Sequence, residues 1–282
     1  MYRLIVENER GQTLELTGNR NYDVLSVSGT NPPVAAINTV PIVGVDGTRF
    51  NSSRTEQRNI VLSLNIQPPI ETNRLLLYEF FKVKRWVKLY YKNRNRDVYI
   101  EGYVESFENN PWTKLQQPQI SIICPQPYWL AKTETRVRFS ASNALFEFPF
   151  SIPDGGIEFS TVLALTTATI NAGEVETGCI ITLYADANGV ENPKIYNNTT
   201  GDFFGVNVTM QAGDVITINS LKGEKSVFLQ RGTTKTNLLG DRASGSAWIV
   251  LAPELNELTI DAAEGLDKLR ATVQLVQKFE GV

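Results

Sequence analysis

Alternation of apolar and polar residues at period two is the feature that most restricts the fold of this 282-residue chain. The stretch RNIVLSLNI (58–66) is typical, because its isoleucines and leucines point to one face and mostly polar residues to the other. In the second half such stretches recur about every 8–12 residues, the spacing of a β-sandwich or barrel. NRLLLYEFF is too densely apolar for alternation and predicts one helix over roughly 73–83. The sequence therefore predicts a mainly β protein with one α-helix.

A long turn-rich stretch, residues 29–57, interrupts this pattern. It is rich in proline and glycine and carries no apolar periodicity of its own. Such a long segment in a compact domain is usually functional or mobile. We expect it to be a loop that becomes ordered on contact with a partner. The residues expected to make that contact are Pro32, Pro33, Pro41, Asp46 and Arg49.

A domain seam is expected where the strand-like stretch 119–124 runs into PQPYW. The two prolines cannot continue a central strand, and two large aromatic residues follow them. We expect the prolines to stiffen the exit and the aromatics to pack at the junction. The seam residues are Pro125, Pro127, Tyr128 and Trp129. The predicted domains are 1–131 and 132–282, with the second sandwich opening at 149–156.

Composition excludes several classes of function. The chain has no histidine, which removes Ser-His-Asp and Cys-His catalysis and nearly all zinc, iron and copper sites. Cys124 and Cys179 stand in apolar stretches and are expected to be buried thiols. Glu101 and Glu105 share a strand face about 13 Å apart, too far for a glycosidase pair. We therefore expect no enzyme, no catalytic residue, no metal and no cofactor.

The ends and apolar runs of the chain predict a cytoplasmic origin. The N-terminus lacks the charged and apolar regions of a signal peptide. No apolar run approaches the roughly 20 residues that span a bilayer, so no membrane span is expected.

The run from Lys82 to Arg96 is basic, contains no acid, and includes three aromatic residues. Within it Trp86, Lys88, Tyr90 and Lys92 share one face of a strand at period two. Aromatic residues are enriched at protein interfaces, so a subunit interface is the favoured interpretation, with an ordinary solvated surface as the alternative. Aromatic-lined basic grooves also bind nucleic acid, but the net charge of −3 argues against stable binding of that kind.

The order of these parts resembles the distal tail protein (Dit) family of siphophages. The stretches that carry the resemblance are GVDGTRF (44–50), RNIVLSLNI (58–66), NRLLLYEFF (73–81), VYIEGYVESFE (98–108), ISIICPQPYWL (120–130), the segment from NPKIY to KSVF (192–228) and AWIVLAPELNELTI (247–260). Each stretch is weak alone, and their order over nearly the whole chain makes the resemblance.

The resemblance implies a structural protein at the tip of a phage tail or in the baseplate of a tail-derived bacteriocin particle. It implies an N-terminal β-sandwich or split barrel with one helix, and a galectin-like or jelly-roll C-terminal β-sandwich. Six copies would form a ring, assembled in the bacterial cytoplasm, that joins the tail tube protein to the tail-tip (hub) protein. The N-terminal domains would build the ring, with 29–57 touching a neighbouring subunit or the tube. The C-terminal domains would project outward, where a receptor-binding protein is a further expected partner.

The alternative function, from a different class, is a carbohydrate-binding β-sandwich of the adhesin type. Sugar sites commonly use exposed aromatic side chains, and the second half offers Tyr196, Phe203, Phe204 and Trp248. Phe203 and Phe204 are adjacent on one strand, so they must point to opposite faces and at most one can be exposed.

Overall fold

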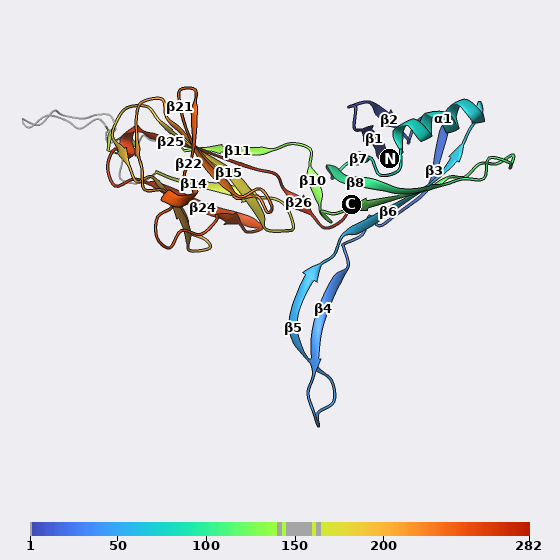
Figure 1. Ribbon diagram of the computed structural model, residues 1–282, viewed down its shortest axis with the longest axis horizontal. Helices are drawn as coiled ribbons and strands as arrows, with labels where there is room; N and C mark the ends of the chain where they lie inside the picture. Colours follow the sequence, from blue (N-terminus) through green and yellow to red (C-terminus); the bar gives the residue numbers. More distant parts are fainter. Residues whose placement is uncertain (1, 140–142, 145–159, 162–164) are drawn as a thin grey trace, which may run out of the picture. The chain divides into compact units, whose positions relative to one another are not determined.

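The computed structural model describes residues 2–139, 143–144, 160–161 and 165–282, and the expected sandwich opening at 149–156 lies outside them. The fold is mainly β, with one α-helix in the described part of the chain. The chain divides into two compact units (Figure 1). Unit 1 comprises 1–132 together with 278–282, and unit 2 comprises 133–277.

The end of the chain returns to unit 1, which corrects the expected second domain of 132–282. Strand β26 (Lys278–Phe279) pairs with β10 (Trp129–Ala131), and β10 pairs with β8 (Asp97–Glu108). The sequence did not reveal this return, because a strand of two residues is too short to show a hydrophobic period.

Unit 1 is built on one antiparallel sheet with the strand order β2-β1-β7-β8-β9-β6-β3. Besides β8, this sheet contains β1 (Arg3–Asn8), β2 (Thr13–Glu15), β3 (Tyr22–Ser28), β6 (Arg58–Ile66), β7 (Trp86–Lys92) and β9 (Gln119–Cys124). In β6 every second residue is buried, which confirms the predicted alternation. The apolar faces of these strands meet in a single core.

Helix α1 spans Ile70–Phe80, about three residues earlier than the predicted 73–83. Its N-cap residue is Pro69, which has the extended backbone usual at that position, with φ −78° and ψ 113°. Asn73, a residue type common at helix N-caps, is instead buried within the helix, where its side-chain amide donates to the carbonyl of Gln67 at 2.8 Å. Leu77 and Phe80 face the core of unit 1.

The stretch 29–57 is not a strandless loop, as had been expected, but a long β-hairpin. Strands β4 (Ala35–Pro41) and β5 (Thr48–Thr55) pair with each other and form a separate sheet. Figure 1 shows this hairpin, in blue, standing away from the sheet of unit 1. Its side chains are almost all exposed on both faces, so no buried-exposed alternation was available to predict its strands. We call residues 34–56 the arm.

Unit 2 is a β-sandwich whose sheets run β11-β25-β15-β20-β21-β22, with β23 also on β15, and β14-β24-β17-β18. Both sheets contribute to one core. The strands are β11 (Thr135–Arg138), β14 (Leu165–Asn171), β15 (Thr177–Ala185), β17 (Lys194–Asn197), β18 (Asp202–Gly205), β20 (Val215–Asn219), β21 (Ser226–Arg231), β22 (Thr234–Asn237), β23 (Val250–Leu251), β24 (Glu254–Asp261) and β25 (Leu269–Leu275). Shorter elements are β12 (Asn143–Ala144), β13 (Ser160–Thr161), β16 (Val190–Glu191), β19 (Thr209–Met210), η1 (Leu239–Asp241) and η2 (Leu266–Lys268).

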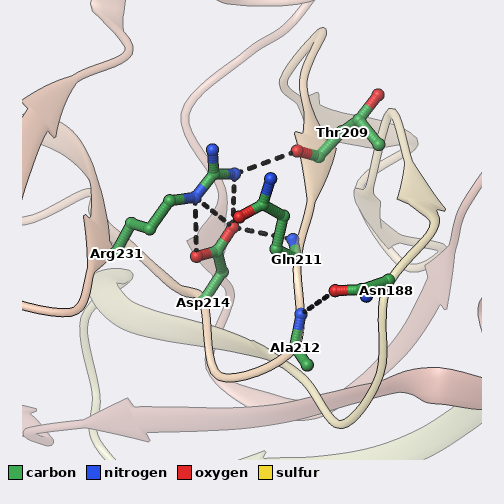
Figure 2. A network of polar contacts seen from close by, with 6 residues as sticks. All are labelled: Asn188, Thr209, Gln211, Ala212, Asp214 and Arg231. Atoms are coloured by element: carbon green, nitrogen blue, oxygen red, sulfur yellow. Dashed lines mark hydrogen bonds and ion pairs between the residues drawn. The ribbon is translucent and has the colours of Figure 1, made fainter.

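A polar network stabilises one rim of unit 2 (Figure 2). Asp214 is buried, and its carboxylate accepts hydrogen bonds from the Arg231 guanidinium, the shortest at 2.6 Å, and from the Gln211 amide at 2.8 Å. Arg231 also donates to the Thr209 carbonyl, which ties β21 to β19. The hydrogen bonds from Arg231 are the main reason why the pKa of Asp214 lies below its usual value.

Both cysteines are buried and unpaired, as predicted. Burial raises the pKa of each thiol to about 12, because desolvation disfavours the thiolate. Neither thiol is therefore a nucleophile at neutral pH.

Candidate assembly interface

The arm presents the largest group of exposed apolar side chains in unit 1. Val43 at its tip is fully exposed, and the others are Val34, Ile37, Val40, Ile42, Val45 and Phe50. Soluble monomers rarely expose so many apolar residues together, and such surfaces mark interaction sites. Each arm strand is paired on one side by the other, which leaves an open edge on each.

Three of the five predicted contact residues lie on this hairpin, and the other two precede it. Pro41 ends β4, Arg49 lies on β5 opposite Val40, and Asp46 is in the connecting turn. These three are exposed, whereas Pro32 and Pro33 lie in the segment that leads into the arm.

Arg58 anchors the base of the arm. Its buried guanidinium donates to the carbonyls of Pro127 at 2.6 Å, Gly29 at 2.7 Å and Asn31 at 2.6 Å, and to that of Glu280. One side chain therefore joins the segment that leads into the arm, the turn after β9 and the C-terminal segment. Burial lowers the pKa of the Arg58 guanidinium and is the largest effect on it, because desolvation disfavours the charged form.

Sequence reasoning missed Arg58, although a signal was present. The period of β6 places Arg58 on the same face as Ile60, so the alternation itself puts an arginine among buried residues. A buried guanidinium needs several acceptors, and that requirement points to a structural hub.

The predicted seam residues lie close to the base of the arm. The Pro127 carbonyl accepts from Arg58, and the Tyr128 hydroxyl lies 3.1 Å from the hydroxyl of Thr55 on β5. Trp129 was expected at the junction, but it is 1% exposed and belongs to the core of unit 1. The reason is that β10, which begins at Trp129, is still part of the unit 1 sheet.

The residues around Pro125 border an open hollow of about 210 Å³ on unit 1. We call it the aromatic hollow. Its walls include Trp86, Glu101, Tyr103, Pro125, Tyr128 and Leu130. Tyr103 is half exposed there, so the hollow offers an accessible apolar surface.

The aromatic-basic row lies on β7 with its side chains on one face, as the period predicted. Lys88 is partly buried; its Nζ lies 3.0 Å from the Glu101 carboxylate and 4.5 Å from the centre of the Tyr99 ring. Lys92 pairs with Asp97 at 2.6 Å. Acids on β8 therefore balance the basic row, which reduces its attraction for nucleic acid. β7 itself is paired with β1 and β8, so only its side chains can make contacts.

Most of the aromatic residues suggested for a sugar site are buried or packed against another aromatic ring. Phe204 is buried, and Trp248 packs against it with ring centres 4.9 Å apart. Tyr196 and Phe203 form a half-buried pair on β17 and β18, with ring centres 5.6 Å apart. The expectation that only one of Phe203 and Phe204 is accessible is confirmed.

Two other kinds of feature are absent from the parts of the chain that the structure describes. Those residues contain no group of three or more Cys, Asp or Glu placed to hold a metal ion. None of their helices is long and apolar enough to cross a membrane.

Two family profiles match this sequence, one in each unit. The phage tail protein RIFT-related domain matches residues 9–124, and the C-terminal domain of the siphovirus-type tail component matches 172–273. The chain belongs to the siphovirus-type distal tail component family. It is thus a structural component of the distal tail and baseplate hub. Among curated proteins, no sequence match was found.

Solved structures agree with the fold over the full length. Dit of phage SPP1, described as a paradigm of the hub adsorption apparatus in phages that infect Gram-positive bacteria, is 14% identical with a TM-score of 0.69, covering 99% of both chains. A chain of the phage P2 baseplate, in its activated conformation with Ca, is 12% identical with a TM-score of 0.53, covering 100% of both chains.

Proposed function

We propose that six copies of this distal tail component close into a head-to-tail ring that joins the tail tube protein to the tail-tip (hub) protein. The observation that carries the proposal is the arm, a long hairpin whose apolar side chains have no core within its own unit. A ring needs heterologous contacts, in which a projecting element of one copy meets a different surface of the next. The arm is such an element.

In this proposal unit 1 builds the ring and unit 2 projects from it. The arm lies against a neighbouring copy or the tube ring, and its open edges can add strands to a partner sheet. Pro41, Asp46 and Arg49 make these contacts, with Pro32 and Pro33 setting the direction of the arm. The row formed by Trp86, Lys88, Tyr90 and Lys92 contributes side-chain contacts at the subunit boundary.

The proposal extends to partners and location. Unit 2 offers the surface for a receptor-binding protein, and assembly takes place in the bacterial cytoplasm before the ring becomes part of a virion tail tip or a tail-like particle. The family is structural, and we propose no catalytic step for this chain.

The test is to replace arm residues 35–55 by an Asn-Gly turn, a sequence suited to a tight hairpin. The Glu56 amide and the Val34 carbonyl, 3.0 Å apart, already close the base of the arm. We expect the wild-type chain to form rings in negative-stain images and light scattering, and the shortened chain to remain a folded single copy. Normal rings from the shortened chain would contradict the role of the arm, and a wild-type single copy at every concentration would contradict the ring.

A further inference from the structure

The loop between β8 and β9, residues 109–118, carries the most exposed tryptophan of the described chain. Trp112 is 93% exposed, and Leu115 beside it is 59% exposed. Burying a tryptophan removes on the order of 200 Å² from water, so an exposed one is costly unless a partner covers it. Figure 1 shows the loop extending beyond the end of β8 and β9.

Hydrogen bonds hold this loop in one conformation. The Asn110 side chain accepts from the Trp112 amide at 3.1 Å, and the Thr113 hydroxyl donates to the Leu115 carbonyl at 2.8 Å. Gln116, which is buried, donates to the Pro111 carbonyl at 3.0 Å. An ordered loop loses little conformational entropy on binding, as expected of a preformed contact element.

The aromatic hollow is a suitable receptor for one large side chain. Its volume of about 210 Å³ is below the roughly 300–1,000 Å³ of small-molecule pockets. Tyr103, Tyr128 and Leu130 provide apolar and aromatic walls. Tryptophan and tyrosine in such pockets are the residues that dominate binding energy at protein interfaces.

Trp112 cannot reach the hollow of its own copy. The part of β8 from Tyr103 to Glu108 spans about 17 Å at the usual strand rise, and the loop then leads further away. Contact between the two features therefore requires a second copy of the chain. A projecting residue and a separate pocket on the same molecule make a head-to-tail contact, the type that closes rings.

We propose that Trp112 of one copy inserts into the aromatic hollow of the next copy in the ring. This inference rests on the proposed ring and identifies a specific contact within it. Charge supports the pairing, because exposed Lys114 follows Trp112 in the loop and Glu101 borders the hollow. Glu101 already binds Lys88 at 3.0 Å but retains oxygen lone pairs for a second cation.

The test compares full-length variants in light scattering over a dilution series. Trp112→Ala removes the inserted side chain. Gln126 is exposed and also lines the aromatic hollow, so Gln126→Trp fills it. Each is expected to raise the concentration at which half the chains assemble by about 30-fold, the effect of losing one central interface residue. Trp112→Phe should lie between the wild type and Trp112→Ala. Leu255→Ala, which removes an exposed apolar side chain from unit 2, is the control and should assemble normally.

A disulfide test locates the contact. The double variant Trp112→Cys, Gln126→Cys should give covalent multimers on oxidation, and either single variant should not; the native Cys124 and Cys179 are buried. If the wild type forms rings, Trp112→Ala assembles normally and the double variant gives no covalent multimers, this contact is overturned and the ring proposal stands. A wild-type protein that never assembles would overturn the ring, and the contact with it.

Discussion

Replacing Arg58 with methionine should destabilise unit 1 and loosen the base of the arm. The change keeps a long apolar side chain but removes the donors to four carbonyl oxygens. A buried acceptor that loses its partner costs about 1–3 kcal/mol. The Pro127 carbonyl is the most enclosed of the four, and water can partly replace the donor at the others. We therefore expect a loss of about 3–5 kcal/mol in the free energy of unfolding, similar to breaking a buried ion pair.

Calorimetry of the whole chain can measure this effect. At roughly 2–4 °C for each kcal/mol, the unfolding temperature of unit 1 should fall by about 10 °C, while the transition of unit 2 stays in place. Hydrogen exchange should accelerate at residues 29–33 and 280–282, which Arg58 connects. Arg58→Lys should lie between, because one ammonium group cannot serve four separate acceptors. The exposed Arg94→Met is the matched control and should change stability by less than about 0.5 kcal/mol.

Unchanged unfolding and exchange in Arg58→Met would refute the reasoning. A uniform loss of stability without faster exchange at those two segments would show that Arg58 supports the core but does not hold the arm.

Three further predictions concern burial and charge. Trp129→Ala should destabilise unit 1 by about 3–5 kcal/mol because Trp129 lies in its core; normal melting of unit 1 would show that Trp129 acts at the seam instead. Because the pKa of Asp214 is lowered by folding, its stabilising effect on unit 2 is present above the unfolded pKa of about 3.9 and lost as pH falls through the lower folded value. Urea titrations should thus show that Asp214→Asn is less stable than wild type at pH 6, with the difference shrinking below about pH 4; a difference independent of pH would contradict the role of its charge. Cys124 and Cys179, with pKa values raised to about 12, should react with an alkylating agent at pH 8 only after unfolding, and fast labelling of the native protein by mass spectrometry would contradict their burial.

Elements with one buried face could be predicted from the sequence. The strand expected at 119–124 is β9, with the same bounds, and the alternation in 58–66 matches β6. Helix α1 was predicted about three residues too late, because the prediction began at Asn73, a residue type common at helix starts. In the structure Asn73 lies inside the helix and donates to the Gln67 carbonyl. In each case the signal came from residues that pack against a single core.

The parts that serve assembly were harder to predict because their partners are not in the chain. The strands of the arm are exposed on both faces and show no period. The sequence carries no signal for the exposure of Trp112, because one tryptophan outside any apolar period does not show which face it takes. Trp129 was placed at the seam because prolines precede it, yet the short pairing of β10 with β8 and β26 keeps it in the core.

The mass and shape of the purified wild-type protein test the central claim most directly. Light scattering combined with negative-stain images of the same fractions should show a closed ring with a central opening and six times the 31.5 kDa mass of one chain. A single-chain mass at every concentration, or open filaments of variable length, would contradict it.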